Sequence, residues 1–335
     1  MYTSGTTGKP KGVLQTYGNH FFSATASMLN FGFSKEKDAW LCAVPIFHIS
    51  GLSILMRSVI YGIPVYLEPR FDAERMVKLI ASGRVTHVSV VMTMLKRLLE
   101  LKSEPFHSNL RVMLLGGSAA PKEIVAQSLA QNWPLVQSFG MTETASQVVS
   151  LQPEAAAEKI GSSGKILFPS ELKIVKQQET DLDGEIWIKG PTVFAGYLNR
   201  EQETKAAFVD GFFRTGDLGH LDADGFLYVA ERRSDLIISG GENIYPTEVE
   251  HVLLSVAGVL EAAVVGEKDA EWGEKPVAHL VVASNFDEEA LRENLEARLA
   301  RFKIPKAFIY HEKLPRTASG KVQRHRLKKE KFSAD

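Results

Sequence analysis

The sequence predicts an α/β fold in which a parallel sheet and a small β-rich subdomain are followed by a smaller α+β domain. Three observations lead to this prediction. Strand-like and helix-like stretches alternate over residues 59–134, the order that builds βαβ units and a parallel sheet. Short strands separated by Asp/Gly turns follow over residues 165–229. The chain of 335 residues also exceeds the roughly 250–300 residues that one hydrophobic core accommodates, so at least two domains are expected.

In the α/β part, VIYGIPVYL (59–67) predicts a strand around Val65. DAERMVKLIASG (72–83) predicts a helix that Asp72 caps and Gly83 ends. Two further strands are expected at 86–92 and 110–118, and two further helices at 93–102 and 121–133. Because ligands bind at the carboxyl ends of the strands in such sheets, a binding site is expected at that edge.

The later elements differ in pattern. Strands of the β-rich subdomain are expected at 171–175, 184–190 and 225–230. After a junction near 234–235, strands expected at 261–267 and 276–284 precede a helix over 287–302. One apolar stripe runs along that helix, formed by Leu291, Leu295, Leu299 and Phe302.

Composition excludes several classes of protein. The formal net charge of −1, from 39 basic and 40 acidic residues, argues against a general nucleic-acid-binding protein. No apolar run approaches the ~20 residues that span a bilayer, so membrane insertion is not expected. The single cysteine, Cys42, lies in the apolar run WLCAVPIF and is expected to be buried. One thiol cannot form an internal disulfide, which favours a cytoplasmic protein.

The chain opens with YTSGTTGKPKGV (2–13), a run of residues typical of a phosphate-binding loop. Glycine lets backbone N–H groups approach phosphate oxygens, while hydroxyls add donors and lysine adds charge. The Walker A pattern fails, because only two residues separate Gly5 from Gly8 and Pro10 follows Lys9. A plain turn between strands is the remaining alternative for this loop taken alone.

Six further motifs follow in order. They are PIFHISG (45–51), LLGGSAAP (114–121), SFGMTETAS (138–146), FRTGDL (213–218), ERRSDLIISGGENIYPTEVE (231–250) and PRTASGKVQR (315–324). Together with the opening string they resemble the motifs of the adenylate-forming superfamily, which contains acyl- and aryl-CoA ligases, peptide-synthetase adenylation domains and luciferases. The resemblance extends along the whole chain.

The resemblance implies a domain organisation. Residues 1–233 would be the remaining part of the large AMP-binding domain, with an α/β part at 1–160 and the β-rich subdomain at 161–233. Residues 234–335 would form a mobile α+β domain that carries the catalytic lysine. Members of the superfamily have a further stretch before the phosphate loop, so the chain is expected to be N-terminally truncated and to expose apolar surface where that stretch packs.

The resemblance also implies a two-step reaction. A carboxylate attacks the α-phosphate of ATP to give an acyl-adenylate and pyrophosphate, and the thiol of coenzyme A then expels AMP. The expected nucleotide- and CoA-binding residues are Thr3, Ser4, Gly5, Thr6, Thr7, Gly8 and Lys9 at the phosphates, Gly116 and Gly117 beside adenine, Asp217 at the ribose hydroxyls, Arg232 at the ribose or phosphate, and Gly240 and Gly241 along the pantetheine arm. Glu143 would bind Mg²⁺, a cation that prefers oxygen ligands.

Three residues are expected to be catalytic. By resemblance, Thr142 would bond the α-phosphate, His48 would gate the acyl pocket and orient the carboxylate, and Lys321 would stabilise the transition state. Asp235 would be the hinge that withdraws Lys321 before the second step.

Each of these residues also has a purely structural alternative. Thr142 and Glu143 would be helix-capping residues, and Asp217 an ordinary turn aspartate. His48 would be a core histidine, and Lys321 part of a solvated basic run.

Three stretches resemble one branch of the superfamily, the o-succinylbenzoate–CoA ligases of menaquinone biosynthesis. They are residues 2–20, 43–67 and 138–147. A dianionic aromatic acid needs a cationic or multi-donor contact for its second carboxylate, for which the candidates are Arg57, Ser89, Ser118 and Gln147.

The expected partners are therefore ATP, CoA and a small carboxylic acid, and self-association is left open. Two alternatives remain. The chain would be a ligase for another aryl or fatty acid, or a non-catalytic nucleotide-binding fragment.

Overall fold

The computed structural model describes most of the chain. The described residues are 1–3, 11–101, 105–106, 108–117, 120–232, 235–239, 242–269, 272–317, 320 and 322–328, without the side chains of 231, 232, 242 and 243. The chain divides into two compact units, one formed by 1–215 with 219–229 and the other by 216–218 with 230–335. The predicted domain boundary between 233 and 234 lies outside the described residues and stays a prediction.

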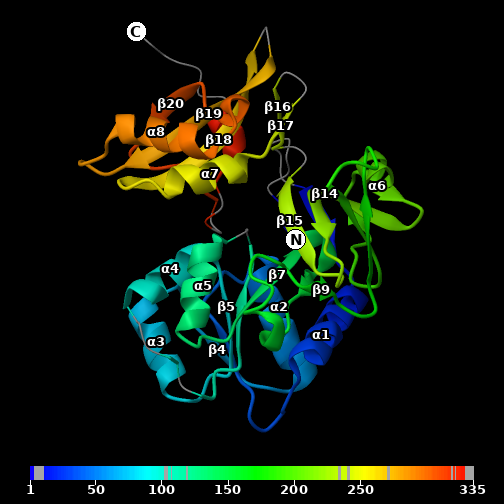
Figure 1. The fold of residues 1–335 in the computed structure, drawn as a ribbon. Helices are drawn as coiled ribbons and strands as arrows, with labels where there is room; N and C mark the ends of the chain where they lie inside the picture. The colour runs from blue at the N-terminus through cyan, green and yellow to red at the C-terminus, as the bar shows by residue number, and fades with distance from the viewer. Residues whose placement is uncertain are drawn as a thin grey trace. The chain divides into compact units, whose positions relative to one another are not determined.

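The first unit is built on a seven-stranded sheet (Figure 1). Its strands, in spatial order, are β4 (Val65–Leu67), β3 (Trp40–Cys42), β5 (His87–Val90), β6 (Val112–Leu115), β7 (Leu135–Met141), β8 (Ser146–Ser150) and β9 (Lys165–Ile166). The strands from β4 to β7 are parallel, as the sequence predicts, whereas β8 and β9 are antiparallel. Strands β3, β5 and β6 are buried along their length, and β3 and β6 are accordingly continuous apolar runs, whereas β5 also buries His87 and Ser89.

Helices pack against this sheet. They are α1 (Tyr17–Phe31), α2 (Ile49–Tyr61), α3 (Ala73–Ala81), α4 (Met92–Leu101) and α5 (Lys122–Ala130), with a short helix η2 at Pro153–Ala155. Helices α1 and α2 pack on each other, and so do α3 and α4 (Figure 1). Asp72 caps α3 as predicted, since its side chain accepts a hydrogen bond from the backbone N–H of Arg75. Cys42 is buried on β3, as expected.

Part of the predicted strand at 59–67 is wrong. Residues up to Tyr61 belong to α2, and the strand occupies only Val65–Leu67. The buried residues Ile54, Arg57 and Tyr61 of α2 are three and four apart, which is the helical period. Gly62, with φ of +69°, ends the helix in the left-handed region that glycine adopts without strain.

The β-rich part contains two smaller sheets. One comprises β10 (Glu171–Val175), β11 (Gly184–Lys189), β13 (Phe208–Val209), β14 (Phe212–Leu221) and β15 (Leu227–Arg232). The other comprises β1 (Tyr2–Thr3), β2 (Lys11–Leu14) and β12 (Gly196–Tyr197), and helix α6 (Glu201–Ala207) follows β12. The three strands expected in this part are therefore present.

The second unit is a sheet with helices. Its strands are β16 (Ile237–Ser239), β17 (Glu242–Ile244), β18 (Val259–Asp269), β19 (Gly273–Val282) and β20 (Ala307–Tyr310), and its helices are α7 (Pro246–Leu254), α8 (Glu288–Arg298), η3 (Arg301–Lys303) and α9 (Arg324–Leu327). Helices α7 and α8 bury one apolar cluster against the sheet. The predicted helix at 287–302 is shorter than expected, because Leu299 is extended and ends α8. Asp287 caps it, and Leu291 and Leu295 of the predicted stripe are buried.

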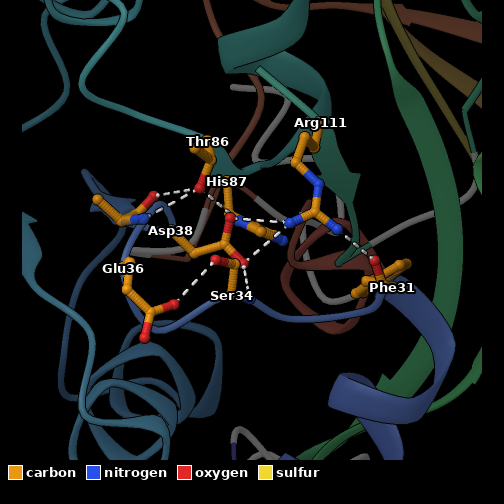
Figure 2. A network of polar contacts seen from close by, with 8 residues as sticks. Phe31, Ser34, Glu36, Asp38, Thr86, His87 and Arg111 are labelled. Atoms are coloured by element: carbon orange, nitrogen blue, oxygen red, sulfur yellow. Dashed lines mark hydrogen bonds and ion pairs between the residues drawn. The ribbon is translucent and has the colours of Figure 1, made fainter. Parts of the chain in front are cut away.

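A polar network closes the amino end of the large sheet (Figure 2). Asp38 precedes β3, Thr86 precedes β5 and Arg111 precedes β6, so all three lie at the edge opposite the carboxyl ends. Arg111 donates to both carboxylate oxygens of Asp38, at 2.8 and 2.9 Å, and to the backbone oxygen of Phe31 at 2.9 Å. Thr86 contacts His87 Nδ1 at 2.8 Å. This network fixes the loop before β3 to the sheet, away from the expected site.

Candidate active site

The arms of the predicted phosphate loop form a β-hairpin. Strand β1 pairs antiparallel with β2, with Thr3 opposite Lys11. Strand β12 pairs with the other side of β2 and places Tyr197 opposite Val13. The three-stranded sheet thus supports the base of the loop. Thr3 lies at the end of one arm.

Several predicted residues lie outside the described residues, and their positions are not stated. They are Ser4, Gly5, Thr6, Thr7, Gly8, Lys9, Ser118, Gly240, Gly241 and Lys321.

Thr142 and Glu143 lie in a tight turn between β7 and β8. The turn is one short helix, η1 (Thr142–Thr144). The capping contacts of this turn come from Thr144. Its Oγ1 accepts a hydrogen bond from the backbone N–H of Met141 at 3.0 Å and donates one to the carbonyl of Ser146 at 2.8 Å. Thr144 therefore occupies the capping role considered for Thr142 and Glu143, whose own side chains are half-buried.

Contacts from distant parts of the chain join this turn to the phosphate-loop hairpin. The Tyr197 hydroxyl on β12 donates to Glu143 Oε1 at 3.0 Å, and the Phe194 N–H donates to the Glu143 carbonyl at 2.8 Å. Gln15, just after β2, donates through Nε2 to the Thr142 carbonyl at 2.6 Å. The carboxylate expected to bind Mg²⁺ is thus tied to the sheet that carries the phosphate loop.

The chemistry of Glu143 suits magnesium. Among the described residues, no group of three or more His, Cys, Asp or Glu side chains could hold a metal ion by itself. Mg²⁺ is usually bound through one or two carboxylates together with substrate phosphates. A half-buried glutamate tied through Tyr197 to a strand that flanks the predicted phosphate loop fits that pattern.

The adenine-side glycines lie at the carboxyl end of the parallel sheet. Gly116 directly follows β6, and its N–H donates to the Val90 carbonyl at the end of β5, at 3.2 Å. Gly117 has φ of +94°, a conformation that favours glycine. Both therefore lie at the edge where the sequence predicts a binding site.

His48 directly precedes helix α2. It is half-buried at the N-cap position of α2, and its ring centroid lies 4.6 Å from that of Phe47. Phe47 and Ile46 are exposed. The Nε2 atom of His48 is nevertheless buried, so both roles considered for this residue stay predictions.

Two of the four candidate carboxylate-binding residues lie together. Arg57 on α2 is 1% exposed and donates to Gln147 Oε1 at 2.8 Å and to Ser146 Oγ at 3.3 Å. Its guanidinium carbon lies 5.2 Å from the ring centroid of Trp40. Ser89, by contrast, accepts a hydrogen bond from Trp40 Nε1 at 3.2 Å.

Arg57 is a buried cation without a matching anion. No described carboxylate forms an ion pair with it, and its buried Nε atom has no hydrogen-bond partner. Burial lowers the pKa of its guanidinium, although an arginine remains charged in a protein. Ser146 and Gln147 follow the Thr142–Glu143 turn by a few residues, so this cation lies against the strand that leaves the turn.

The remaining predicted residues belong to the second unit. Asp217 is buried on β14, directly after Gly216, whose φ is +73°. Arg232 ends β15. The hinge candidate Asp235 lies 3.5 Å from Arg324, which also donates to both carboxylate oxygens of Glu250 at 2.8 Å.

Tyr197 and Arg324 are two residues of these contacts that no sequence pattern predicts. Tyr197 meets a residue 54 positions away, and Arg324 meets one 74 positions away. No local spacing signals such contacts.

Comparisons with known proteins agree with the motifs. Residues 1–198 match the family model of AMP-binding enzymes, and residues 248–321 match that of the AMP-binding enzyme C-terminal domain. A 2-succinylbenzoate–CoA ligase of Listeria monocytogenes is 60% identical over 328 residues, which are 98% of this chain and 69% of the relative.

Solved structures are also similar. The o-succinylbenzoate CoA synthetase of Bacillus subtilis in complex with its acyl-adenylate intermediate has a TM-score of 0.93 and 50% identity, covering 99% of this chain and 69% of that one. The same enzyme in complex with ATP and a magnesium ion has a TM-score of 0.92 and 51% identity, covering 98% and 69%. The predicted family and fold class are confirmed by these matches.

Proposed function

The chain belongs to the AMP-binding enzyme family, and from this premise we propose that it is an ATP-dependent acid–CoA ligase that converts 2-succinylbenzoate to 2-succinylbenzoyl-CoA. The substrate has a benzoate carboxylate and a succinyl carboxylate, so two anionic groups must be accommodated. The pathway proposed for the product is menaquinone biosynthesis.

One observation supports the choice of a dianionic acid, namely the buried and uncompensated charge of Arg57. Burying an unpaired cation destabilises a fold, so such a group normally has an anionic partner. We assign the second carboxylate of the substrate to Arg57, with Ser146 and Gln147 beside it. A hydrogen bond between charged groups contributes about 1.5–3 kcal/mol.

The first step joins the acid to AMP. A carboxylate oxygen attacks the α-phosphorus of ATP, the bond to the bridging oxygen breaks, and pyrophosphate leaves. We propose that Thr142 donates a hydrogen bond to the α-phosphate and that Thr3 through Lys9 bind the outer phosphates. A magnesium ion held by Glu143 would neutralise phosphate charge. Lys321 would donate to the α-phosphate and to the acid as negative charge gathers there.

The second step forms the thioester. The thiolate of CoA attacks the carbonyl carbon of the adenylate, and AMP leaves with the bonding electrons. We propose that rotation at Asp235 removes Lys321 and brings in Gly240 and Gly241, which lack side chains that would obstruct the pantetheine arm. Gly116 and Gly117 would lie beside adenine. Asp217 would accept hydrogen bonds from the ribose hydroxyls, Arg232 would contact the ribose or phosphate, and His48 would gate the acid pocket and orient the carboxylate.

Mass spectrometry tests the reaction. The chain is incubated with ATP, Mg²⁺, CoA and 2-succinylbenzoate, and the acyl-adenylate and the acyl-CoA are both expected. Pyrophosphate release only with other aryl or fatty acids would favour a ligase of different specificity. ATP binding by calorimetry with no pyrophosphate release for any acid would instead favour a nucleotide-binding fragment.

The Lys321→Ala substitution tests the first step. Adenylate formation is expected to fall on the order of 10²–10³-fold, because one electrostatic contact in the transition state is lost. Lys328→Ala is the matched control, since Lys328 is an exposed lysine of the same basic run. Equal effects of the two substitutions on pyrophosphate release would contradict the assignment.

The proposed partners are small molecules: the acid, ATP and CoA. No described helix has the length and apolar character needed to cross a membrane. Cytoplasmic localisation and self-association stay predictions. Cell fractionation tests the first, and size-exclusion chromatography tests the second.

A further inference from the structure

The Tyr197 hydroxyl makes a hydrogen bond of 3.0 Å to Oε1 of Glu143. We propose that Tyr197 is a positioning residue whose hydroxyl orients the Glu143 carboxylate toward the magnesium ion of bound ATP. This inference rests on the proposed function, in which Glu143 is a metal ligand.

The ring of Tyr197 is itself held on several sides. Its backbone belongs to β12, and its N–H donates to Thr204 Oγ1 at 2.9 Å. Phe194 packs edge-on against the ring at 4.8 Å, and the ammonium of Lys11 lies 5.1 Å from the ring centroid. Lys11 is in turn paired with Glu203 at 2.7 Å. The hydroxyl therefore has a defined direction, as a group that orients a ligand needs.

The Tyr197 hydroxyl donates to the Glu143 carboxylate itself, whereas the described backbone contacts near this residue do not reach the carboxylate. The Phe194 N–H and the Gln15 amide fix the carbonyls of Glu143 and Thr142, but neither contact touches the glutamate side chain. A glutamate side chain has several rotatable bonds, and ordering it costs about 1.5–2 kcal/mol. The phenol donor stabilises one orientation in advance.

A tyrosine suits this role chemically. It donates one hydrogen bond without bringing a positive charge that would compete with the metal ion. An ionised carboxylate has about four acceptor sites, so one hydrogen bond does not exhaust its capacity for a cation. Because the described residues offer no metal cluster of protein ligands alone, the orientation of one carboxylate matters more here than in a site with several.

The inference also links the two halves of the nucleotide site. Tyr197 pairs through its backbone with Val13 on β2, one arm of the phosphate loop, and through its side chain with Glu143. The phosphate loop and the metal ligand would therefore keep their separation when ATP enters. This arrangement is pre-organised rather than assembled by the ligand.

Metal binding measured without turnover tests the inference. Mn²⁺ replaces Mg²⁺ as the probe, α,β-methylene-ATP replaces ATP so that the bond to the leaving group cannot break, and free Mn²⁺ is counted by electron paramagnetic resonance. Tyr197→Phe is expected to weaken Mn²⁺ binding about 10-fold, the lower end of the effect of losing a group that orients a metal ligand. In pyrophosphate release with Mg²⁺ and ATP, the deficit is expected to shrink as Mg²⁺ is raised.

The matched control is Tyr310→Phe. Tyr310 donates to Glu288 at 2.6 Å in the second unit, so the substitution removes the same kind of tyrosine–carboxylate bond elsewhere. It is expected to leave Mn²⁺ affinity unchanged. The melting temperature of each variant is measured, so that a loss of folding is recognised.

Glu143→Gln distinguishes the positioning role of Tyr197 from the metal-binding role of Glu143. If it weakens Mn²⁺ binding while a folded Tyr197→Phe does not, the positioning role is overturned and the proposed function stands. If Glu143→Gln itself has no effect, the metal role of Glu143 and the inference both fail. Weakening by both substitutions, with none from Tyr310→Phe, supports the inference.

Discussion

At position 57 a charged residue occupies a place where an apolar one would be expected. Arg57 comes from a helix, is surrounded by Trp40, Gln147 and Ser146, and has no described carboxylate as an ion-pair partner. Replacing buried charge with well-packed apolar groups is often neutral or stabilising. A charge retained here is therefore better explained by recognition of an anion than by stability of the fold.

Arg57→Met is expected to raise KM for 2-succinylbenzoate by roughly 10- to 100-fold, since a charge-assisted hydrogen bond is lost. Its melting temperature is expected to stay the same or rise. An acid with only one carboxylate serves as the comparison substrate, and its KM is expected to change little. Arg75→Met, at an exposed arginine, is the control for net charge. A uniform loss of activity for all acids, with a lower melting temperature, would indicate a structural role.

At the scale of elements, the turn between β7 and β8 is the most constrained feature of the site. A Cβ on Gly140 would meet the Ser146 carbonyl at 2.1 Å, so only glycine allows the two strands to approach this closely. Ala145 and Ser146 both have positive φ, at 52° and 100°. Such strain persists where the surrounding contacts determine it, and it is commonly found at functional sites.

Thr144→Val is expected to lower the free energy of unfolding by about 1–3 kcal/mol, because the Met141 N–H and the Ser146 carbonyl, both half-buried, lose their partner. Urea denaturation measures this change. Adenylate formation should also slow, since the neighbouring Glu143 is no longer held in the same turn. Thr25→Val on α1 removes an exposed hydroxyl that donates to the carbonyl of Phe21, and it is expected to change stability by less than about 0.5 kcal/mol. A Thr144→Val protein as stable as this control would contradict the importance of the turn.

At the scale of the whole molecule, both units contain buried histidines that resist protonation. Burial lowers the pKa of His87 in the first unit to about 4, and the same cause lowers the pKa of His279 in the second unit to about 4. His87 stacks on Trp40, with ring centroids 4.9 Å apart, and His279 contacts His311 at 2.8 Å. Both rings therefore favour the neutral form.

Acid is expected to destabilise both units. The pKa of each histidine is lower in the folded state than its unfolded value of 6.5. The contribution of the neutral ring to the free energy of unfolding is therefore complete above pH 6.5 and declines as pH falls toward 4. Each histidine contributes on the order of 3 kcal/mol over this range. Calorimetry between pH 7.5 and 4.5 measures the decline, which His87→Gln and His279→Gln should each make shallower. His325→Gln on the short helix α9 is the control, and an unchanged slope in both core variants would refute the argument.

The family, the α/β class and the elements named above over 59–134, 165–229 and 261–302 were for the most part predictable from the sequence, because each depends on residues close together in the chain. The alternation over 59–134 predicted the parallel sheet, Asp72 and Asp287 predicted helix starts, and the ordered motifs predicted the AMP-binding family. One exception was the stretch near Val59, where local sequence and tertiary packing favoured different secondary structures. β-branched residues near Val59 favoured a strand, but burial of the opposite face made that stretch the end of α2.

The tertiary structure decided which distant side chains meet. Tyr197 reaches Glu143, and Arg57 reaches Gln147, across long separations that no periodicity encodes. The physical reason is that a hydrogen bond or a buried charge depends on the distance between atoms in the folded chain, whereas secondary structure and motifs depend on spacing along the sequence. The sequence alone therefore determined which chemistry to expect. Only folding decided that Tyr197 lies against Glu143 and that Arg57 lies against Gln147.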